Sequence, residues 1–315
     1  MESQVGSLIN DGCWTFHFLF IATLFVATFW INNDIINLYG YACRLASMMF
    51  LIIQGICILS IAYKINQFLV DYHSEAGSTV SISLLLGTTI GLYAFDILFL
   101  YYQFMWFGGC TFNLWVLILS IMMFFVYTAL TVLQTRENAS ILTNAFVMSY
   151  TLYLSWTAMA SEPDDECNPF VYSNSNTIAQ IVLGLIFTSI SILSISIITK
   201  SDDEGFRSNW AESSDENSLD NLEVGNKTIP VENSFIFPIS VATMYFHGVM
   251  ILACCYYAML LSNWGDPTVN NDKTNYFKAN EFSVWMKLLS QFICYLIFLW
   301  SLIGPIVMPD REWDI

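Results

Sequence analysis

Eight long apolar stretches, separated by short polar segments, constrain the fold of this chain more than any other feature. They cover roughly residues 14–31, 38–70, 79–105, 112–133, 139–160, 177–199, 235–264 and 283–308. A helix needs about 20 predominantly apolar residues to cross the hydrocarbon core of a bilayer. Because the stretches do not alternate in polarity, they indicate helices rather than the strands of a barrel. We therefore expect an all-α, polytopic membrane protein, one membrane domain over residues 1–315 with about eight transmembrane helices.

The composition supports a membrane protein and argues against a nucleic-acid partner. Hydrophobic residues make up 56% of the chain and charged residues 11%, whereas about 25% charged residues is usual in soluble domains. The formal net charge is −16, and a nucleic-acid partner requires a basic surface. The partners that we expect are membrane phospholipids, and both a monomer and a homo-oligomer remain open.

The few basic residues predict an orientation, because Lys and Arg are enriched on the cytosolic side of membranes. Alternating the loops places six of the ten on one side: Lys64, Arg136, Lys200, Arg207, Lys227 and Arg311. We expect this side to be cytosolic, in the plasma membrane or an endomembrane, with both termini. Segment 200–234 would face the same side as an acidic, disordered loop. The sequons at Asn138 and Asn226 would then stay unglycosylated.

Asp96 is the acid that lies well inside an apolar stretch, and it shares a helical face with Thr89, Tyr93 and Gln103. A carboxyl group inside a membrane is costly and is often functional. Two interpretations follow: a hydrogen-bonded Asp at a helix contact, or the ion site of a secondary transporter.

A second stripe of small and polar residues, in the stretch 177–199, includes Gln180, Gly184, Thr188, Ser191 and Ser194. Small residues allow membrane helices to approach closely, and hydroxyls bond across the interface. Packing is the simpler interpretation. The alternative is the wall of a polar groove for a lipid headgroup.

Sequence signatures of enzymes are missing from the chain. No Gly-x-Ser-x-Gly, His-Glu-x-x-His or Walker sequence occurs, and no Cys/His spacing is typical of a metal site. We therefore expect no enzyme, no catalytic residue, no metal and no cofactor.

The most specific segment is 146–170, which reads FVMSYTLYLSWTAMASEPDDECNPF. Its Tyr-rich helix, its Trp-Thr-Ala stretch and its Cys-Asn-Pro turn resemble the serine incorporator (Serinc) family. Residues 245–264 and 285–313 are similar to the last two helices of that family. The family-motif positions are Trp156, Glu162, Pro163, Cys167, Asn168, Pro169, Asn263 and Trp264.

The resemblance implies two helical bundles linked by a long tilted helix, which the stretch 38–70 matches. It also implies ten spans, and this chain begins where the third would begin. A shortened member or a fragment that lacks two N-terminal helices would explain this difference.

The resemblance implies a lipid-handling function without ATP: scrambling of phospholipids such as phosphatidylserine, or promotion of serine incorporation into phosphatidylserine and sphingolipids. Serine or enzymes of lipid synthesis would then be further partners. We expect a headgroup pathway along the polar residues of two helices: Ser149, Tyr150, Tyr153, Gln180, Thr188 and Ser191.

Cys110 and Cys167 both face outward in the predicted topology, where a disulfide can persist in an oxidising compartment. The sequence does not give their separation, so a bond between them and two separate thiols both remain open.

Overall fold

The described part of the chain is helical throughout its regular structure and contains no strand. The computed structural model describes residues 14–76, 79–133, 140–170, 173–219, 241–262, 264 and 281–308. The helices are α2 (Trp14–Ala27), η1 (Thr28–Trp30), α3 (Asn33–Ala76), α4 (Thr79–Phe107), α5 (Thr111–Val132), α6 (Ile141–Met159), α7 (Asn174–Leu219), α8 (Val241–Leu261) and α9 (Glu281–Val307). The predicted all-α, polytopic membrane fold is confirmed.

Six of the described helices, α3, α4, α5, α7, α8 and α9, are long and apolar enough to cross a membrane. Two of the eight predicted spans are not among these six helices. The apolar helix over Thr15–Trp30 is shorter, and α6 is too polar to be counted although it has 19 residues.

The chain divides into two compact units. Met1–Leu38 and Ile195–Met250 form one, and Tyr39–Ser194 and Ile251–Ile315 form the other, which we call the main bundle. Helix α3 has 44 residues, about 66 Å at the rise of an α-helix, and it contributes to both units. In the other unit, α2 exposes large apolar side chains such as Phe16 and Phe18, as lipid-facing helices do.

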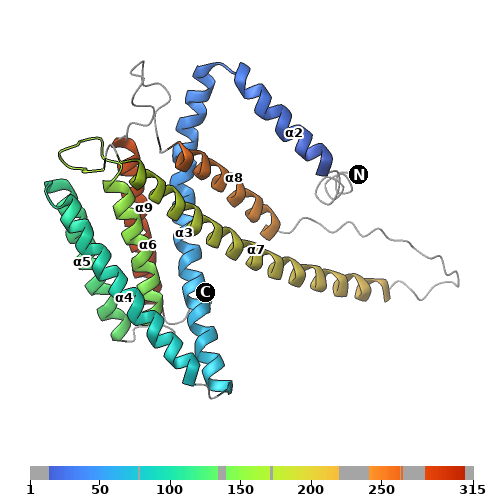
Figure 1. Ribbon diagram of the computed structural model, residues 1–315. Helices are drawn as coiled ribbons and strands as arrows, with labels where there is room; N and C mark the ends of the chain where they lie inside the picture. Colours follow the sequence, from blue (N-terminus) through green and yellow to red (C-terminus); the bar gives the residue numbers. More distant parts are fainter. Residues whose placement is uncertain are drawn as a thin grey trace. The chain divides into compact units, whose positions relative to one another are not determined.

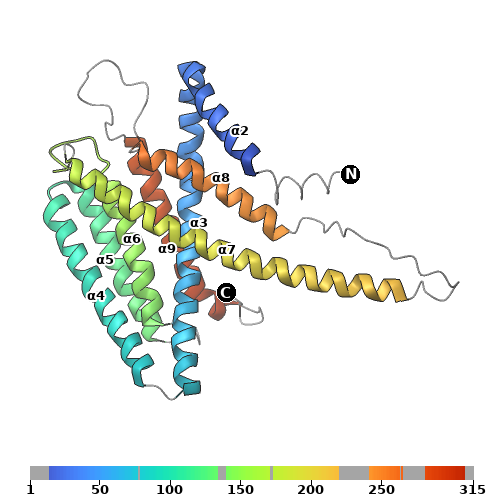
Figure 2. The same ribbon diagram turned by 45° about the vertical axis from the view of Figure 1, so that its right-hand side comes forward.

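Within the main bundle, α6 is the central helix. It packs against α4, α5 and α9, and Figures 1 and 2 show α4, α5 and α6 side by side from both directions. From Leu142 to Met159 nearly every residue of α6 is buried. Its polar residues therefore contact other helices rather than lipid, which explains why a less apolar helix is tolerated here.

An aromatic and aliphatic core joins α3, α5, α6 and α9. It consists of Leu59, Tyr63, Tyr127, Val147, Met148, Tyr295, Phe298 and Leu302. The Tyr127 hydroxyl donates to the Tyr295 carbonyl at 2.8 Å. The helices approach closely at Gly55, where an added Cβ would lie 2.6 Å from Cys294 Sγ. These contacts make one face of α3 part of the bundle core.

Helix α7 extends further than the sequence suggests. It continues to Leu219, so residues 200–219 of the segment expected as a loop are helical, and residues 220–234 lie outside the described part. No proline occurs between Pro169 and Pro230, so no residue in this stretch prevents the helical hydrogen bonding from continuing beyond the apolar part.

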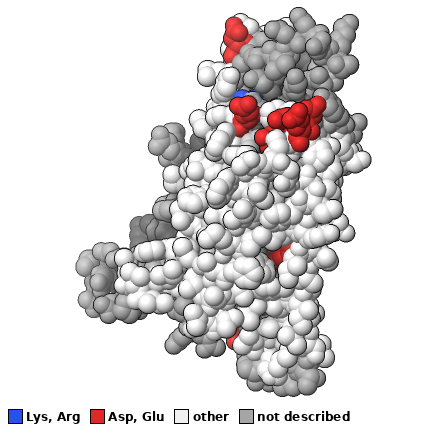
Figure 3. Space-filling model, turned by 90° about the vertical axis from the view of Figure 1, so that its left-hand side faces the viewer, with Lys and Arg blue, Asp and Glu red and all other residues white. Residues whose placement is uncertain are grey.

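On the face of the molecule shown in Figure 3, most of the acidic surface gathers at one end. The exposed acids Asp164, Asp165 and Glu166 lie in the loop between α6 and α7. Below this patch the visible face is almost entirely uncharged, and large apolar residues of α4 and α5 such as Leu98 and Phe125 are exposed there. A broad uncharged band beside a charged end is the surface expected of a protein embedded in a bilayer.

Candidate functional site

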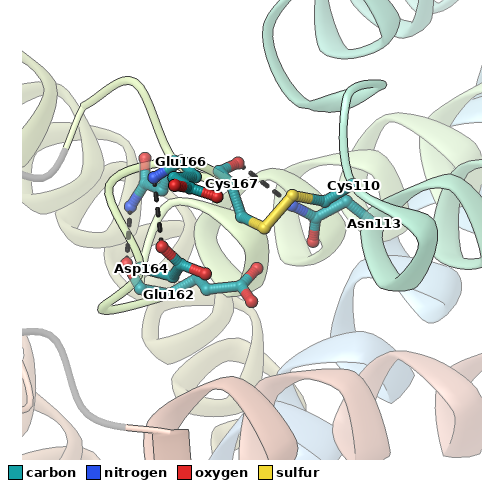
Figure 4. Close-up of a disulfide and its surroundings, with 7 residues drawn as sticks. Cys110, Asn113, Glu162, Asp164, Glu166 and Cys167 are labelled. Atoms are coloured by element: carbon teal, nitrogen blue, oxygen red, sulfur yellow. Dashed lines mark hydrogen bonds between the residues drawn. A yellow bond between two sulfur atoms is a disulfide. The ribbon is translucent and has the colours of Figure 1, made fainter.

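The loop between α6 and α7 is tied to the start of α5 by a disulfide. Cys110 and Cys167 are bonded, with their Cα atoms 5.4 Å apart (Figure 4). Of the two alternatives that the sequence left open, the structure contains the bond. Beside it, the Asn113 side chain of α5 donates to the Cys167 carbonyl at 3.2 Å. The loop is thereby held at two adjacent points.

Asn168 closes the same loop from inside. Its side-chain amide donates to the carbonyls of Ala160 and Glu162, both at 2.9 Å. Its side-chain oxygen accepts from the Phe170 amide at 3.0 Å. Asn168 is 1% exposed. Buried backbone groups need hydrogen-bond partners, and the Asn168 side chain supplies them for three backbone groups of this turn.

Glu162 is the partly buried acid of this loop (Figure 4). Burial raises its pKa above the ordinary value of 4.5, the charges of Asp164 and Glu281 act in the same direction, and a hydrogen bond from Asn113 opposes them. One carboxyl oxygen, Oε2, has no partner in the described residues. This end of the bundle therefore contains a carboxyl that is protonated more readily than an ordinary Glu.

A polar seam joins α4 to α6, with Asp96 near its middle. Asp96 is fully buried, and the Ser149 hydroxyl of α6 donates to its Oδ1 at 2.6 Å. Its Oδ2 has no hydrogen-bond partner in the described part of the chain. The carboxyl is thus partly satisfied, in a place that water does not reach.

The seam continues in both directions along α6. Toward one end, the Asn144 amide donates to the Tyr93 hydroxyl at 2.6 Å and to Thr128 Oγ1 at 3.1 Å. Toward the other, Ser155 donates to Gln103 Oε1 at 3.0 Å, and Gln103 donates to the Leu152 carbonyl at 3.1 Å. Three positions of the stripe predicted on α4, Tyr93, Asp96 and Gln103, therefore face α6, whereas Thr89 donates to the Leu85 carbonyl of its own helix.

The opposite face of α6 bonds to α3 and, through it, to α7. The Tyr150 hydroxyl donates to the Leu51 carbonyl at 2.8 Å and lies 3.2 Å from Gln54 Oε1. The Gln54 amide donates to Thr188 Oγ1 at 3.3 Å. Tyr153 packs against Phe187 with ring centroids 4.9 Å apart and the rings tilted by 43°. Polar groups thus follow α6 on two faces.

A small cavity of about 10 Å³, room for about one water molecule, lies near the disulfide end of the main bundle. It is bordered by Leu51, Tyr153, Leu154, Thr157, Gln180, Ile181, Tyr256, Leu260, Trp264 and Lys287. The Lys287 ammonium is at its wall, 2.7 Å from Ser161 Oγ and 3.2 Å from the Thr157 carbonyl, to both of which it donates. The pocket is bordered by residues of five helices, α3, α6, α7, α8 and α9, and by Trp264, three positions after the end of α8.

The residues predicted to border a headgroup pathway fall into different surroundings. Tyr153 and Gln180 border the pocket. Tyr150 and Thr188 are each hydrogen-bonded to the Gln54 side chain. Ser149 lies on the other face of α6, with Asp96. Ser191 is fully buried and donates to the Phe187 carbonyl at 2.9 Å, within the packing face of α7. Their role in a pathway stays a prediction.

Comparison with known proteins identifies the family. The family model "Serine incorporator (Serinc)" matches residues 2–235 and 240–311. The chain belongs to the Serinc family. Among curated Serinc relatives, a probable serine incorporator of Nematostella vectensis is 26% identical over 99% of this chain and 74% of its own length. Serine incorporator 3 of Bos taurus is 25% identical over 97% of this chain and 73% of its own length.

A membrane protein of Schizosaccharomyces pombe is similar at 27% identity, over 98% of this chain and 73% of its own length. The similarity to these proteins covers all the described helices, the main bundle included.

Four of the Serinc motif residues, Trp156, Cys167, Asn168 and Trp264, are packed or bonded within the main bundle. Trp156 is buried against Phe99, with ring centroids 6.0 Å apart. Cys167 and Asn168 hold the loop, whose positions Glu162, Pro163 and Pro169 are partly or fully exposed. Trp264 is 2% exposed and has a φ of 57°, and its amide donates to the Met259 carbonyl at 2.8 Å. Asn263 lies outside the described residues.

Sequence reasoning missed Lys287 and Gln54 as site residues. Lys287 was visible only as a basic residue in an apolar stretch, and its partners Thr157 and Ser161 are 130 and 126 positions away. An intramembrane charge is itself the signal that could have identified it.

Proposed function

We propose that this Serinc protein handles phospholipids by lowering the barrier for headgroups to cross the bilayer, without ATP. The observation that supports the proposal is the row of buried polar side chains along α6. From Asn144 to Thr157 the row covers 14 residues, about 20 Å along a helix. That length is most of the hydrocarbon thickness of about 30 Å.

The physical argument concerns the cost of moving a headgroup. A zwitterionic or anionic headgroup loses its hydration in hydrocarbon, which costs several kcal/mol for each unsatisfied polar group. Hydroxyls at Ser149, Tyr150, Tyr153, Ser155 and Thr157 can exchange hydrogen bonds with a headgroup when neighbouring helices separate. Each exchange replaces part of the lost hydration, so the barrier decreases while the acyl chains stay in lipid.

Reconstitution of the full chain into vesicles tests this proposal. A fluorescent phosphatidylserine placed in both leaflets is bleached by a membrane-impermeant reductant. Empty vesicles should lose only the outer-leaflet signal, and vesicles with the protein should lose most of the inner-leaflet signal as well. Loss of only the outer-leaflet signal in both preparations would exclude scrambling by this chain.

Two variants connect the assay to α6. Tyr153→Phe removes a buried hydroxyl from the proposed pathway and should slow the exchange between leaflets. Tyr102→Phe removes the hydroxyl of an exposed tyrosine on α4 and should leave the rate unchanged. Equal rates for the two folded variants would show that Tyr153 is not part of the pathway.

A second function follows from the name of the relatives, serine incorporators. In this alternative the chain binds free serine or an enzyme of lipid synthesis and delivers the amino acid to it. Equilibrium dialysis with labelled L-serine, and crosslinking in membranes, would detect either complex. Scrambling without serine binding would exclude this alternative.

A third function, secondary transport, is favoured only by the buried Asp96 with its unpartnered Oδ2. Transporter sites are usually built around interrupted helices, whereas α4 is continuous from Thr79 to Phe107. Asp96→Asn keeps the shape of the side chain and removes the charge. Unchanged function in this variant would exclude Asp96 as an ion site.

A further inference from the structure

The side chains of Glu162 and Asn113 meet where the loop between α6 and α7 passes the start of α5. The Glu162 backbone is fixed at both of its polar groups: the amide donates to the Met159 carbonyl at 3.2 Å, and the carbonyl accepts from the Asn168 side chain at 2.9 Å. The side chain therefore leaves the loop in a defined direction. Figure 4 shows its carboxyl group directed toward Asn113 and the disulfide.

One hydrogen bond already joins the two side chains, and it leaves the Asn113 amide in a fixed orientation. The amide donates to the Glu162 carboxyl, and because Oε2 has no partner among the described residues, the accepting atom is Oε1. The same amide donates to the Cys167 carbonyl at 3.2 Å. A reversed amide would place its oxygen against that carbonyl, where neither atom has a proton to give.

Two oxygen atoms of this pair are left without a donor in the described part of the chain: Glu162 Oε2 and Asn113 Oδ1. Asn113 is fully buried, and a buried acceptor without a donor is costly. A carboxylic acid and a primary amide can form two hydrogen bonds in a ring, one from the amide to the acid and one from the acid to the amide oxygen. A proton on Oε2 would therefore satisfy both atoms at once.

The charges around Glu162 favour that proton. Asp164 in the same loop and Glu281 at the start of α9 both raise the pKa of Glu162, in addition to burial, which is the largest cause. Two bases, Arg44 of α3 and Lys287 of α9, lie at the same end of the bundle, yet the pKa is raised. Helix α5 contains no charged residue. The remaining acids of the loop are exposed: Asp165 and Glu166.

We propose that Glu162 and Asn113 form a proton-binding site that holds the loop between α6 and α7 against α5. With the proton in place, the carboxyl and the amide make both hydrogen bonds of the ring. Without it, a carboxylate oxygen and the amide oxygen repel each other, and the carboxylate is more favourable in water. Loss of the proton thus loosens the loop around the Cys110–Cys167 disulfide, so this end of the bundle responds to the acidity of the compartment that it faces.

The direction of the response follows from the sign of the pKa shift. The folded-state pKa of Glu162 is raised above 4.5, so the closed pair is present at acidic pH and is lost as the pH rises through the raised folded-state pKa. The disulfide should therefore be better protected from reductants at acidic pH than at neutral pH.

Reduction of the disulfide in the full chain in detergent measures this protection. A phosphine reductant acts in the presence of a chelator of divalent cations, and mass spectrometry after alkylation in denaturant counts the Cys110 and Cys167 thiols. Glu162→Gln places an amide donor against Asn113 and imitates the protonated state. Glu166→Gln removes the same charge from the loop and leaves the pair intact. A comparison of the two variants at each pH cancels the pH dependence of the reductant.

At neutral pH, Glu166→Gln should be reduced about threefold to tenfold faster than Glu162→Gln, the ratio expected from the loss of one hydrogen bond. At acidic pH the two rates should coincide, because Glu162 is then protonated. Equal rates at every pH would overturn the proposal, and so would a difference that persists at acidic pH.

Two further measurements identify the proton and its partner. In the Asn113→Ala background, Glu162→Gln should no longer slow the reduction, and an undiminished effect would exclude Asn113 as the partner. If the Asn113→Ala protein does not fold, the comparison of the two glutamine variants still decides. Calcium added to the wild type at neutral pH in place of the chelator should leave the rate unchanged. Slower reduction with calcium would assign the two oxygen atoms to a divalent cation instead of a proton.

Discussion

Ser149 is the donor that accompanies the buried Asp96 carboxyl, at 2.6 Å. Ser149→Ala removes it and leaves neither carboxyl oxygen with a described partner. We expect the variant to lose about 1–3 kcal/mol of stability, the cost of leaving a buried acceptor unsatisfied. Thermal unfolding in detergent, followed by circular dichroism or light scattering, measures the change.

The control for this prediction is Ser189→Ala on α7. The Ser189 hydroxyl is exposed and donates to the Leu185 carbonyl of its own helix, so its loss should be nearly neutral. Equal unfolding temperatures for the two variants would contradict an energetic role for the Asp96–Ser149 pair.

Glu162 makes stability depend on pH in a direction that can be derived. Its folded-state pKa is raised above 4.5, chiefly by burial, so the folded protein binds the proton more tightly than the unfolded chain. Its contribution to stability is therefore fully present below pH 4.5 and is lost as the pH rises through the raised folded-state pKa. We expect Glu162→Gln to remove this part of the pH dependence and to stabilise the protein at neutral pH.

Melting curves recorded across this pH range test the sign. Glu166→Gln, in the same loop but exposed, changes the net charge equally and should keep the wild-type slope. A Glu162→Gln variant that is less stable than the wild type at neutral pH would show that the ionised carboxylate is favourable in the fold.

At the level of helices, the approach of α3 to α9 depends on the absence of a side chain at Gly55. A Cβ there would lie 2.6 Å from Cys294 Sγ and 3.3 Å from Tyr150 Cε1. Gly55→Ala should therefore destabilise the main bundle by about 1–3 kcal/mol through overpacking. Gly87→Ala on α4, where an added Cβ meets nothing within 4 Å, should not reduce stability.

A double variant separates overpacking from other effects of alanine. Cys294→Ala removes the Sγ atom that the new Cβ would strike, so it should recover part of the stability lost in Gly55→Ala. The thermodynamic cycle over the four proteins gives the coupling between the two positions. Additive effects would contradict a direct clash between α3 and α9.

Two signals in the sequence predict the helices: a long apolar stretch, and a stripe of polar residues at helical spacing. The face of α4 with Tyr93, Asp96 and Gln103 is an example, because its partners on α6 leave the 3.6-residue period intact. The central position of α6 could not be predicted, since its burial depends on three neighbouring helices. The Lys287 pocket depends on residues more than 100 positions apart, which only the tertiary fold brings together.

For the whole molecule, the disulfide predicts orientation, because such bonds persist on the oxidising side of a membrane. We expect the Cys110–Cys167 end to face the lumen or the exterior. A membrane-impermeant reductant, applied to intact cells with the protein at their surface, should then make both cysteines available to an impermeant maleimide. Labelling that requires permeabilisation of the membrane would reverse the orientation.

Helix α6 also has a consequence for how the protein is made. It is less apolar than the six helices that are long and apolar enough to cross a membrane, so we expect its insertion to be helped by α4 and α5, which precede it in the chain and pack against it. In the orientation that we expect, Cys167, which follows α6 in the chain, reaches the oxidising side only after α6 has crossed. The bond to Cys110 can then form only after this crossing, so we expect it to make the insertion of α6 difficult to reverse during biosynthesis.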